Sequence, residues 1–254
     1  MNKYLDDLFL YPKDWVDDDA KEFAATARSW AEKEILSQRL EYQQAYATQF
    51  VEKRKTLVMD IGFERLVLPE KQGGYGWNEP TSAPGILTVF TEIGRADEAV
   101  ALMAALKYAV FAIMSMKPNV DTALLNELAP LYFAEKLMNV ALIMPGPGMD
   151  GENTPLFAGR SMSVTMEAAP DGYILSGRQL RPLGPGYAAD LFAVVCADKD
   201  GQTGVAFVPA TAKGVARGAV LKTTGLNACE NSDITLDNVK IPKNYFMNRR
   251  GAVQ

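Results

Sequence analysis

The pattern of apolar and polar positions changes once along the chain, near residue 138. Before that point apolar side chains recur every three or four residues, which is the spacing of amphipathic helices. The first helix is expected to start at the aspartates of residues 17–19, because the helix dipole stabilises negative charge near an N-terminus. Its buried face would be formed by Phe23, Ala27, Trp30 and Ala31.

Four further helices are expected in this half, over residues 43–61, 82–95, 97–116 and 121–137. The run at 97–116 is strongly apolar but carries Lys107 at its centre. A charge in the middle of a membrane span is costly, so we expect a buried helix of a soluble protein with no membrane contact. In the helix over 43–61 the expected core residues are Phe50, Leu57, Val58 and Ile61.

A loop is expected between these helices, where the sequence reads FERLVLPEKQGGYGWNEP at residues 63–80. Pro69 and the glycines Gly73, Gly74 and Gly76 interrupt any helix there. Glycine is the residue that adopts positive φ without strain, so we expect a structural loop that needs this freedom.

After residue 138 the apolar positions alternate in short runs such as GYILSGRQL and LFAVVCA, which are separated by Gly, Pro, Asn and Asp. Short strands with regular turns are typical of a small barrel or sandwich. Helices first and strands second, without alternation, indicate an α+β chain of two domains. We expect an α-helical domain over residues 1–138 and a small antiparallel β-barrel or sandwich over residues 139–254.

Composition narrows the chemistry. The 26 Lys and Arg against 31 Asp and Glu give a net charge of −5, which argues against a nucleic-acid binder. The absence of histidine excludes Ser-His-Asp catalysis and most zinc sites, so no metal site is expected. The only cysteines are Cys196, inside an apolar run, and Cys229, which follows a loop and could be exposed. Two cysteines without CxxC spacing favour a reduced, cytoplasmic setting.

One stretch, ALIMPGPGMDG at residues 141–151, has two interpretations on its residues alone. It is either a strand that runs into a Pro-Gly turn, or a loop whose backbone N–H groups hold an anion of a cofactor. It contains neither the phosphate-binding P-loop pattern nor the dinucleotide-binding glycine pattern.

Four stretches in their order resemble the acyl-CoA dehydrogenase family: PEKQGGYGWN, MPGPGMD at 144–150, GYILSGRQLRPLGPGYAADLFAVVCA at 172–197, and SDITLDNVKIPKNY at 232–245. The family consists of flavoproteins that desaturate acyl-CoA thioesters between the α and β carbons. The resemblance implies the family's helical N-terminal domain followed by its β-barrel middle domain. It also implies FAD as cofactor, an acyl-CoA substrate, and a PEKQGGYGWN loop near the acyl-chain pocket.

The resemblance places cofactor contacts at Leu142, Ile143, Gly148, Met149, Arg181, Pro182 and Leu183. The family has a threonine and a serine at the positions of Ile143 and Met149. It has Trp-Ile-Thr where this chain has Arg181, Pro182 and Leu183. Flavin would therefore lose two hydroxyl donors and a stacking ring, and would keep backbone contacts at Leu142 and Ile143. Each lost buried hydrogen bond is worth roughly 0.5–1.5 kcal/mol, so weaker flavin binding is expected.

Arg181 is the most unusual of these residues, and three roles for it stay open. It is a solvated charge at the edge of the barrel, a partner for a carboxylate of another chain, or a contact for a phosphate. On the substrate side, Asn227 and Cys229 stand where the family often has Arg and Ser or Thr.

The family takes its catalytic glutamate from a C-terminal helical bundle, for which this sequence has no counterpart. No catalytic residue is therefore assigned here. Three hypotheses stay open: a subunit that acts with an acyl-CoA dehydrogenase-like partner, a non-catalytic acyl-CoA-binding or scaffolding relative, and a truncated product. Each of the first two predicts a homo- or hetero-oligomer.

Overall fold

The structure, a computed structural model, describes most of the chain: residues 15–38, 53, 56–57, 61–115, 122–133, 139–144, 163–198 and 203–248. The chain divides into two compact units, residues 1–101 (unit 1) and residues 102–254 (unit 2). The division falls inside helix α5 (Glu98–Ser115). The domain boundary expected after residue 138 stays a prediction.

Unit 1 begins with helix α2 (Asp18–Trp30), which starts where the aspartates predict. The Asp17 carboxylate accepts a 2.7 Å hydrogen bond from the Ala20 N–H and thereby caps the first turn. A wider π turn (Ala31–Ile35) and a 3-10 turn (Leu36–Gln38) follow α2. Of the expected core face, Ala27, Trp30 and Ala31 are buried, whereas Phe23 is only half-buried.

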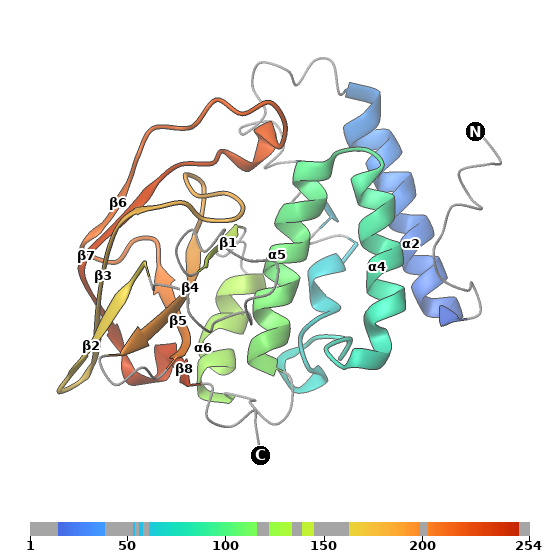
Figure 1. Cartoon of the computed structure of the whole chain (residues 1–254). Coiled ribbons are helices and arrows are strands. Elements are labelled where there is room, and N and C mark those ends of the chain that lie inside the picture. Colours follow the sequence, from blue (N-terminus) through green and yellow to red (C-terminus); the bar gives the residue numbers. More distant parts are fainter. Residues whose placement is uncertain are drawn as a thin grey trace, which may run out of the picture. The chain divides into compact units, whose positions relative to one another are not determined.

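Helix α4 (Ala83–Gly94) packs beside α2 in unit 1 (Figure 1). The two helices approach closely at Gly85, where a β-carbon would lie 2.8 Å from the Cβ of Ala20. Farther along, the buried Glu92 carboxylate forms ion pairs with Arg28 at 3.6 Å and Arg95 at 3.5 Å. This pairing offsets the cost of removing a carboxylate from water.

The loop over residues 63–80 is built from three 3-10 turns, Phe63–Arg65, Glu70–Gln72 and Pro80–Ser82. Gly73 and Gly76 have φ of 82° and 74°, which confirms the expected need for positive φ. Gly74 is required for a different reason. A β-carbon there would lie 1.9 Å from the carbonyl oxygen of Leu68.

The helices expected over 82–95, 97–116 and 121–137 are confirmed as α4, α5 and α6 (Thr122–Phe133). Most of the helix expected over 43–61, including Phe50 and Val58, lies outside the described residues. Leu57 is buried as expected, and Ile61 is half-buried.

Within the described residues one helix, α5, is long and apolar enough to cross a membrane, judged by length and composition only. Of its residues 61% are buried inside the structure, and Lys107 at its centre is only 1% exposed. This burial agrees with the buried core helix that the sequence predicts.

Unit 2 carries one curled sheet with the strand order β6-β7-β3-β2-β4-β5-β8, and β1 pairs with β4 off this path (Figure 1). The pairings are antiparallel except for β1 with β4 and β2 with β4, which are parallel. A purely antiparallel sheet was expected. Parallel neighbours need long connections, and long segments separate both β1 and β2 from β4. The strands are β1 (Val140–Ile143), β2 (Thr165–Ala169), β3 (Gly172–Leu180), β4 (Leu191–Asp198), β5 (Thr203–Pro209), β6 (Val215–Arg217), β7 (Ile234–Pro242) and β8 (Phe246–Asn248).

Candidate functional site

Strand β1 and the segment that follows β3 are joined by two backbone hydrogen bonds between Leu142 and Leu183. The Leu142 N–H donates to the Leu183 carbonyl at 3.1 Å, and the Leu183 N–H donates to the Leu142 carbonyl at 2.8 Å. These residues come from the two distant stretches in which the resemblance places cofactor contacts. The fold therefore brings two of the predicted positions into direct contact.

The Leu142–Leu183 pair also determines which side of β1 the backbone groups of each residue face. Backbone groups of successive strand residues point to opposite sides, so those of Ile143 face β4, where Ile143 is in register with Val194. Asn139 anchors the start of this strand, because its N–H donates to the Asp190 carboxylate at 2.8 Å. β1 is thus bonded along both sides.

Arg181 lies next to this pair and binds a carboxylate of its own chain. Its Nε lies 2.9 Å from Oδ1 of Asp233, and its Nη2 lies 3.2 Å from Oδ2. This hydrogen bonding, with the charge of Asp233, raises the pKa of the Arg181 guanidinium. The side chain is 67% exposed, so it is a paired charge at the surface of the sheet. Pro182 is buried and has no N–H, and Leu183 is 47% exposed.

The turn after Leu183 packs against the segment that precedes β7. A β-carbon on Gly186 would lie 2.7 Å from the carbonyl oxygen of Ser232, which is closer than any side chain permits. The Tyr187 N–H donates to the Glu230 carbonyl at 2.9 Å. Glu230 adopts a φ of 47°, and burial raises the pKa of its carboxyl group. This residue therefore combines a strained backbone with a partly desolvated charge.

The two positions noted on the substrate side have different surroundings. Asn227 is exposed and accepts a 3.1 Å hydrogen bond from the Thr223 hydroxyl. Cys229 is fully buried, so the possibility that its thiol is exposed is wrong. The short 3-10 turn Asn227–Cys229 directs this side chain into the core. Cys196 is buried in β4, as expected of a small core residue.

The fit of these residues to a flavin can be judged at five of the seven predicted positions, because Gly148 and Met149 lie outside the described residues. None of the five carries a hydroxyl group or an aromatic ring. The Leu142 N–H is occupied by the Leu183 carbonyl, and Arg181 is occupied by Asp233. The described positions therefore do not form a flavin cradle by themselves. Among all residues that the structure describes, no group of three or more His, Cys, Asp or Glu residues is arranged to hold a metal ion.

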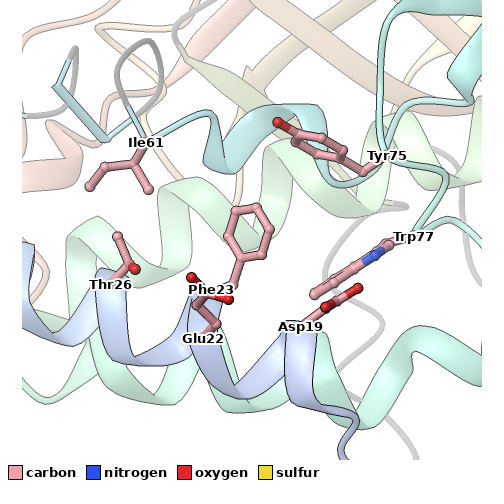
Figure 2. Close-up of a pocket in the computed structure, with 7 residues that line it drawn as sticks. All are labelled: Asp19, Glu22, Phe23, Thr26, Ile61, Tyr75 and Trp77. Carbon is pink, nitrogen blue, oxygen red and sulfur yellow. The ribbon is translucent and has the colours of Figure 1, made fainter.

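A pocket of about 610 Å³ opens in unit 1 between α2 and the loop over residues 63–80 (Figure 2). Three aromatic rings form its body. The Phe23 ring contacts both of the others, with its centroid 5.8 Å from that of Tyr75 and 5.5 Å from that of Trp77. The lining residues are Asp19, Glu22, Phe23, Thr26, Ile61, Tyr75 and Trp77.

Sequence reasoning missed this pocket because it treated Phe23 as core and the glycine-rich loop as structural. One half of the pocket is nevertheless visible in the sequence. Asp19, Glu22, Phe23 and Thr26 follow the i, i+3, i+4, i+7 spacing that places residues on one helix face. That face carries polar residues around one aromatic ring, which is unusual for a surface that only packs against a core.

No protein-family model matches the chain. A solved acyl-CoA dehydrogenase complexed with FAD, from Bacillus anthracis, has a TM-score of 0.73 and 19% identity, and covers 93% of this chain and 38% of its own. The expected resemblance is thus confirmed for the fold, which matches the N-terminal helical and middle β domains of acyl-CoA dehydrogenases.

Two curated proteins are similar in sequence. The 3-(aryl)acrylate reductase of Clostridium sporogenes is 26% identical over 87% of this chain. The caffeyl-CoA reductase-Etf complex subunit CarC of Acetobacterium woodii is 25% identical over 89% of it. In each case the match covers 56% of the relative, so the chain spans about half the length of the curated relatives it matches.

Proposed function

We propose that this chain is a subunit of a flavin-dependent oxidoreductase that acts on the bond between the α and β carbons of acyl-CoA thioesters. The observation that supports the proposal is the Leu142–Leu183 pair, because it joins the two distant stretches in which the resemblance places cofactor contacts, on a fold of the acyl-CoA dehydrogenase type. The two similar curated proteins are named as reductases of unsaturated acids or thioesters, which supports the same bond as the target.

We further propose that a partner chain of the acyl-CoA dehydrogenase type holds most of the flavin and supplies the carboxylate that abstracts the α-proton. The described cofactor positions lack hydroxyl and ring contacts, so the flavin needs contacts from elsewhere. One similar protein is named as the subunit of a complex, which supports a partnered arrangement. The cytoplasmic location expected from the low cysteine count belongs to the same proposal.

Within this proposal the described residues position backbone segments. The hydrogen-bonded pair of Leu142 and Leu183 holds β1 against the segment after β3, and Asn139 fixes the start of the strand. Arg181 is held by Asp233 at the edge of this site, where it presents positive charge to the surface. A bound flavin would supply the redox chemistry.

A second function, non-catalytic binding of acyl-CoA or of a protein in a scaffold, is favoured by one specific observation. The Leu142 N–H and the Arg181 guanidinium are both engaged within the chain, so neither is open to a flavin in this conformation. In this alternative no flavin is bound, and the fold serves only as a binding platform.

Co-expression of the chain with its neighbouring genes distinguishes the two functions. The absorption spectrum of the purified complex is then recorded. The proposal predicts a yellow complex that reduces an electron-accepting dye when an acyl-CoA is added, or oxidises a reduced, electron-donating dye when an enoyl-CoA is added, and does neither without a thioester. The chain purified alone serves as the control and should be colourless, and a titration with FAD should detect no binding to it. A colourless complex without acyl-CoA-dependent activity would disprove the proposal and favour the non-catalytic binding function.

A further inference from the structure

The pocket of unit 1 combines aromatic rings with negative charge, and it has no role in the proposed reaction. Phe23, Tyr75 and Trp77 present apolar ring surface, and Tyr75 is half exposed. Asp19 and Glu22, four residues and one residue before Phe23, lie on the same helix face as that ring (Figure 2). The volume of about 610 Å³ lies within the range of sites for small molecules.

The two carboxylates are available to a ligand. Neither Asp19 nor Glu22 forms an ion pair or a side-chain hydrogen bond with any described residue. The neighbouring acids of the same helix end are used differently: Asp17 caps the helix, and Asp18 pairs with Lys21 at 2.9 Å. The pocket therefore carries two negative charges that the described part of unit 1 does not neutralise.

This chemistry selects one class of ligand. An uncharged apolar molecule would strip water from Asp19 and Glu22 without pairing them, which is costly. A hard divalent cation needs six or more oxygen ligands and gains little from aromatic rings. An organic cation satisfies both features, because aromatic faces attract cations and carboxylates offset their charge. Methylated ammonium fits best, since its methyl groups also bury apolar surface against the rings.

We propose that the pocket between α2 and the loop over residues 63–80 binds a small molecule that carries a methylated ammonium group. The rings of Phe23, Tyr75 and Trp77 contact the methyl groups, and the carboxylates of Asp19 and Glu22 balance the charge. The site lies within unit 1 and depends on no flavin, substrate or partner chain.

The test uses the full chain and choline as the probe, at constant ionic strength. Trp77 is a built-in reporter, so tryptophan fluorescence and calorimetry both follow binding. Saturable binding is expected with a dissociation constant on the order of 1 mM, because two or three ring contacts each add modestly. The neutral isostere 3,3-dimethylbutan-1-ol should bind at least about tenfold more weakly. Equal binding of the alcohol, or no saturation by choline, would overturn the proposal.

Variants separate the rings from the charges. D19N combined with E22Q should weaken choline binding about tenfold, and Tyr75→Leu should weaken it about fivefold. The matched control is E70Q combined with E79Q, which removes the same charge from exposed residues of unit 1 outside the pocket.

The control variant should bind choline within about twofold of the unmodified chain, since exposed charges that do not line the pocket are screened by solvent and salt. If both double variants weaken binding equally, the attraction is the general charge of the surface and the site is disproved. All substituted side chains are exposed, and unchanged circular dichroism confirms that each variant folds. A response of the control alone would also count against the proposal.

Discussion

The hydroxyl of Tyr245 donates a 2.6 Å hydrogen bond to the carboxylate of Glu127, which lies 118 residues earlier in the chain. Asn244 donates to the other oxygen of the same carboxylate at 3.1 Å. Together these bonds tie helix α6 to the 3-10 turn Lys243–Tyr245 that links β7 and β8. A single surface carboxylate therefore joins the helical and sheet parts of unit 2.

Replacing Tyr245 by Phe should lower the free energy of unfolding by about 1.5 kcal/mol, because a hydrogen bond to a charged acceptor is lost. The expected loss is at the low end of the range for hydrogen bonds to charged groups, because Glu127 is exposed and can be rehydrated. Urea denaturation measures the change. The control is Tyr173→Phe, since the Tyr173 hydroxyl makes no hydrogen bond in the described part of the chain. A loss as large in the control would contradict the assignment.

Two tyrosines should make the fold sensitive to alkaline pH. Burial raises the pKa of Tyr108 to about 12, and burial with the Glu127 hydrogen bond raises the pKa of Tyr245 further. The unfolded pKa is about 10, so the folded state holds its protons longer. The stability that the raised pKa values of these two tyrosines contribute to the folded state is thus complete below about pH 10, and it is lost as the pH rises through about 12.

Thermal unfolding between neutral and alkaline pH measures this effect, and the absorbance of tyrosinate follows the titration. The unmodified chain should lose stability above about pH 10 more steeply than a variant that carries both Y108F and Y245F. Identical slopes for the unmodified chain and the double variant would show that neither tyrosine has a raised pKa.

Local features of the fold are predictable from the sequence because they depend on neighbouring residues. Helix α2 starts at the aspartates of residues 17–19 as the helix dipole predicts, and Gly73 and Gly76 have the positive φ that their loop needs. The parallel pairing of β1 with β4 is not predictable in this way, because alternating apolar residues do not reveal the partner strand.

The candidate sites depend on contacts between distant residues, so the sequence predicts only parts of them. The sequence alone leaves three roles open for Arg181, and only the fold shows that Asp233 is its partner. The resemblance points to Leu142 and Leu183 separately, but their mutual hydrogen bonds arise from the sheet. Likewise, the α2 face with Phe23 becomes a pocket only because the loop brings Tyr75 against it.

Glu230 should be a position where substitution stabilises the protein. Its φ of 47° is unfavourable for an ordinary side chain, and burial raises the pKa of its carboxyl group. Asparagine tolerates this backbone conformation and carries no charge, so Glu230→Asn should raise the free energy of unfolding by about 1 kcal/mol at neutral pH. Thermal or urea denaturation measures the gain.

Glu230→Gln separates the charge from the backbone strain, because it removes only the charge. Since the folded pKa is raised, the charged carboxylate costs stability above that pKa, and this cost disappears when the group is protonated at low pH. The benefit of E230Q should therefore be present at neutral pH and fade in acid, whereas part of the benefit of E230N should persist. A benefit of E230Q that does not change with pH would disprove the role of the charge.

The two glycines of the loop, Gly74 and Gly76, should respond differently to alanine. A β-carbon on Gly74 would collide with the Leu68 carbonyl, whereas a β-carbon on Gly76 would meet nothing within 4 Å. Gly74→Ala must displace the backbone and should cost about 3 kcal/mol or more. Gly76→Ala imposes only the strain of positive φ, about 1 kcal/mol. Urea denaturation ranks the two, and an equal cost would show that the close approach to Leu68 does not constrain the loop.

Restoring the lost contacts should increase flavin binding if the proposed site is correct. Arg181→Trp with Leu183→Thr returns a ring and a hydroxyl to positions that are 67% and 47% exposed, so neither change disturbs the core. The backbone bonds between Leu142 and Leu183 do not depend on the side chain. One regained hydrogen bond and one stacked ring, about 2 kcal/mol together, would raise the flavin affinity of the complex about thirtyfold.

The flavin content of the purified complex and its FAD dissociation constant measure this gain. The matched control is Arg178→Trp, which adds the same ring at an exposed arginine of β3 outside the predicted positions. The loss of the Arg181–Asp233 pair should cost little stability, since exposed ion pairs contribute less than about 1 kcal/mol. If the control gains as much flavin as the double variant, the added ring binds flavin without a site, and positions 181–183 are not where this fold would hold it.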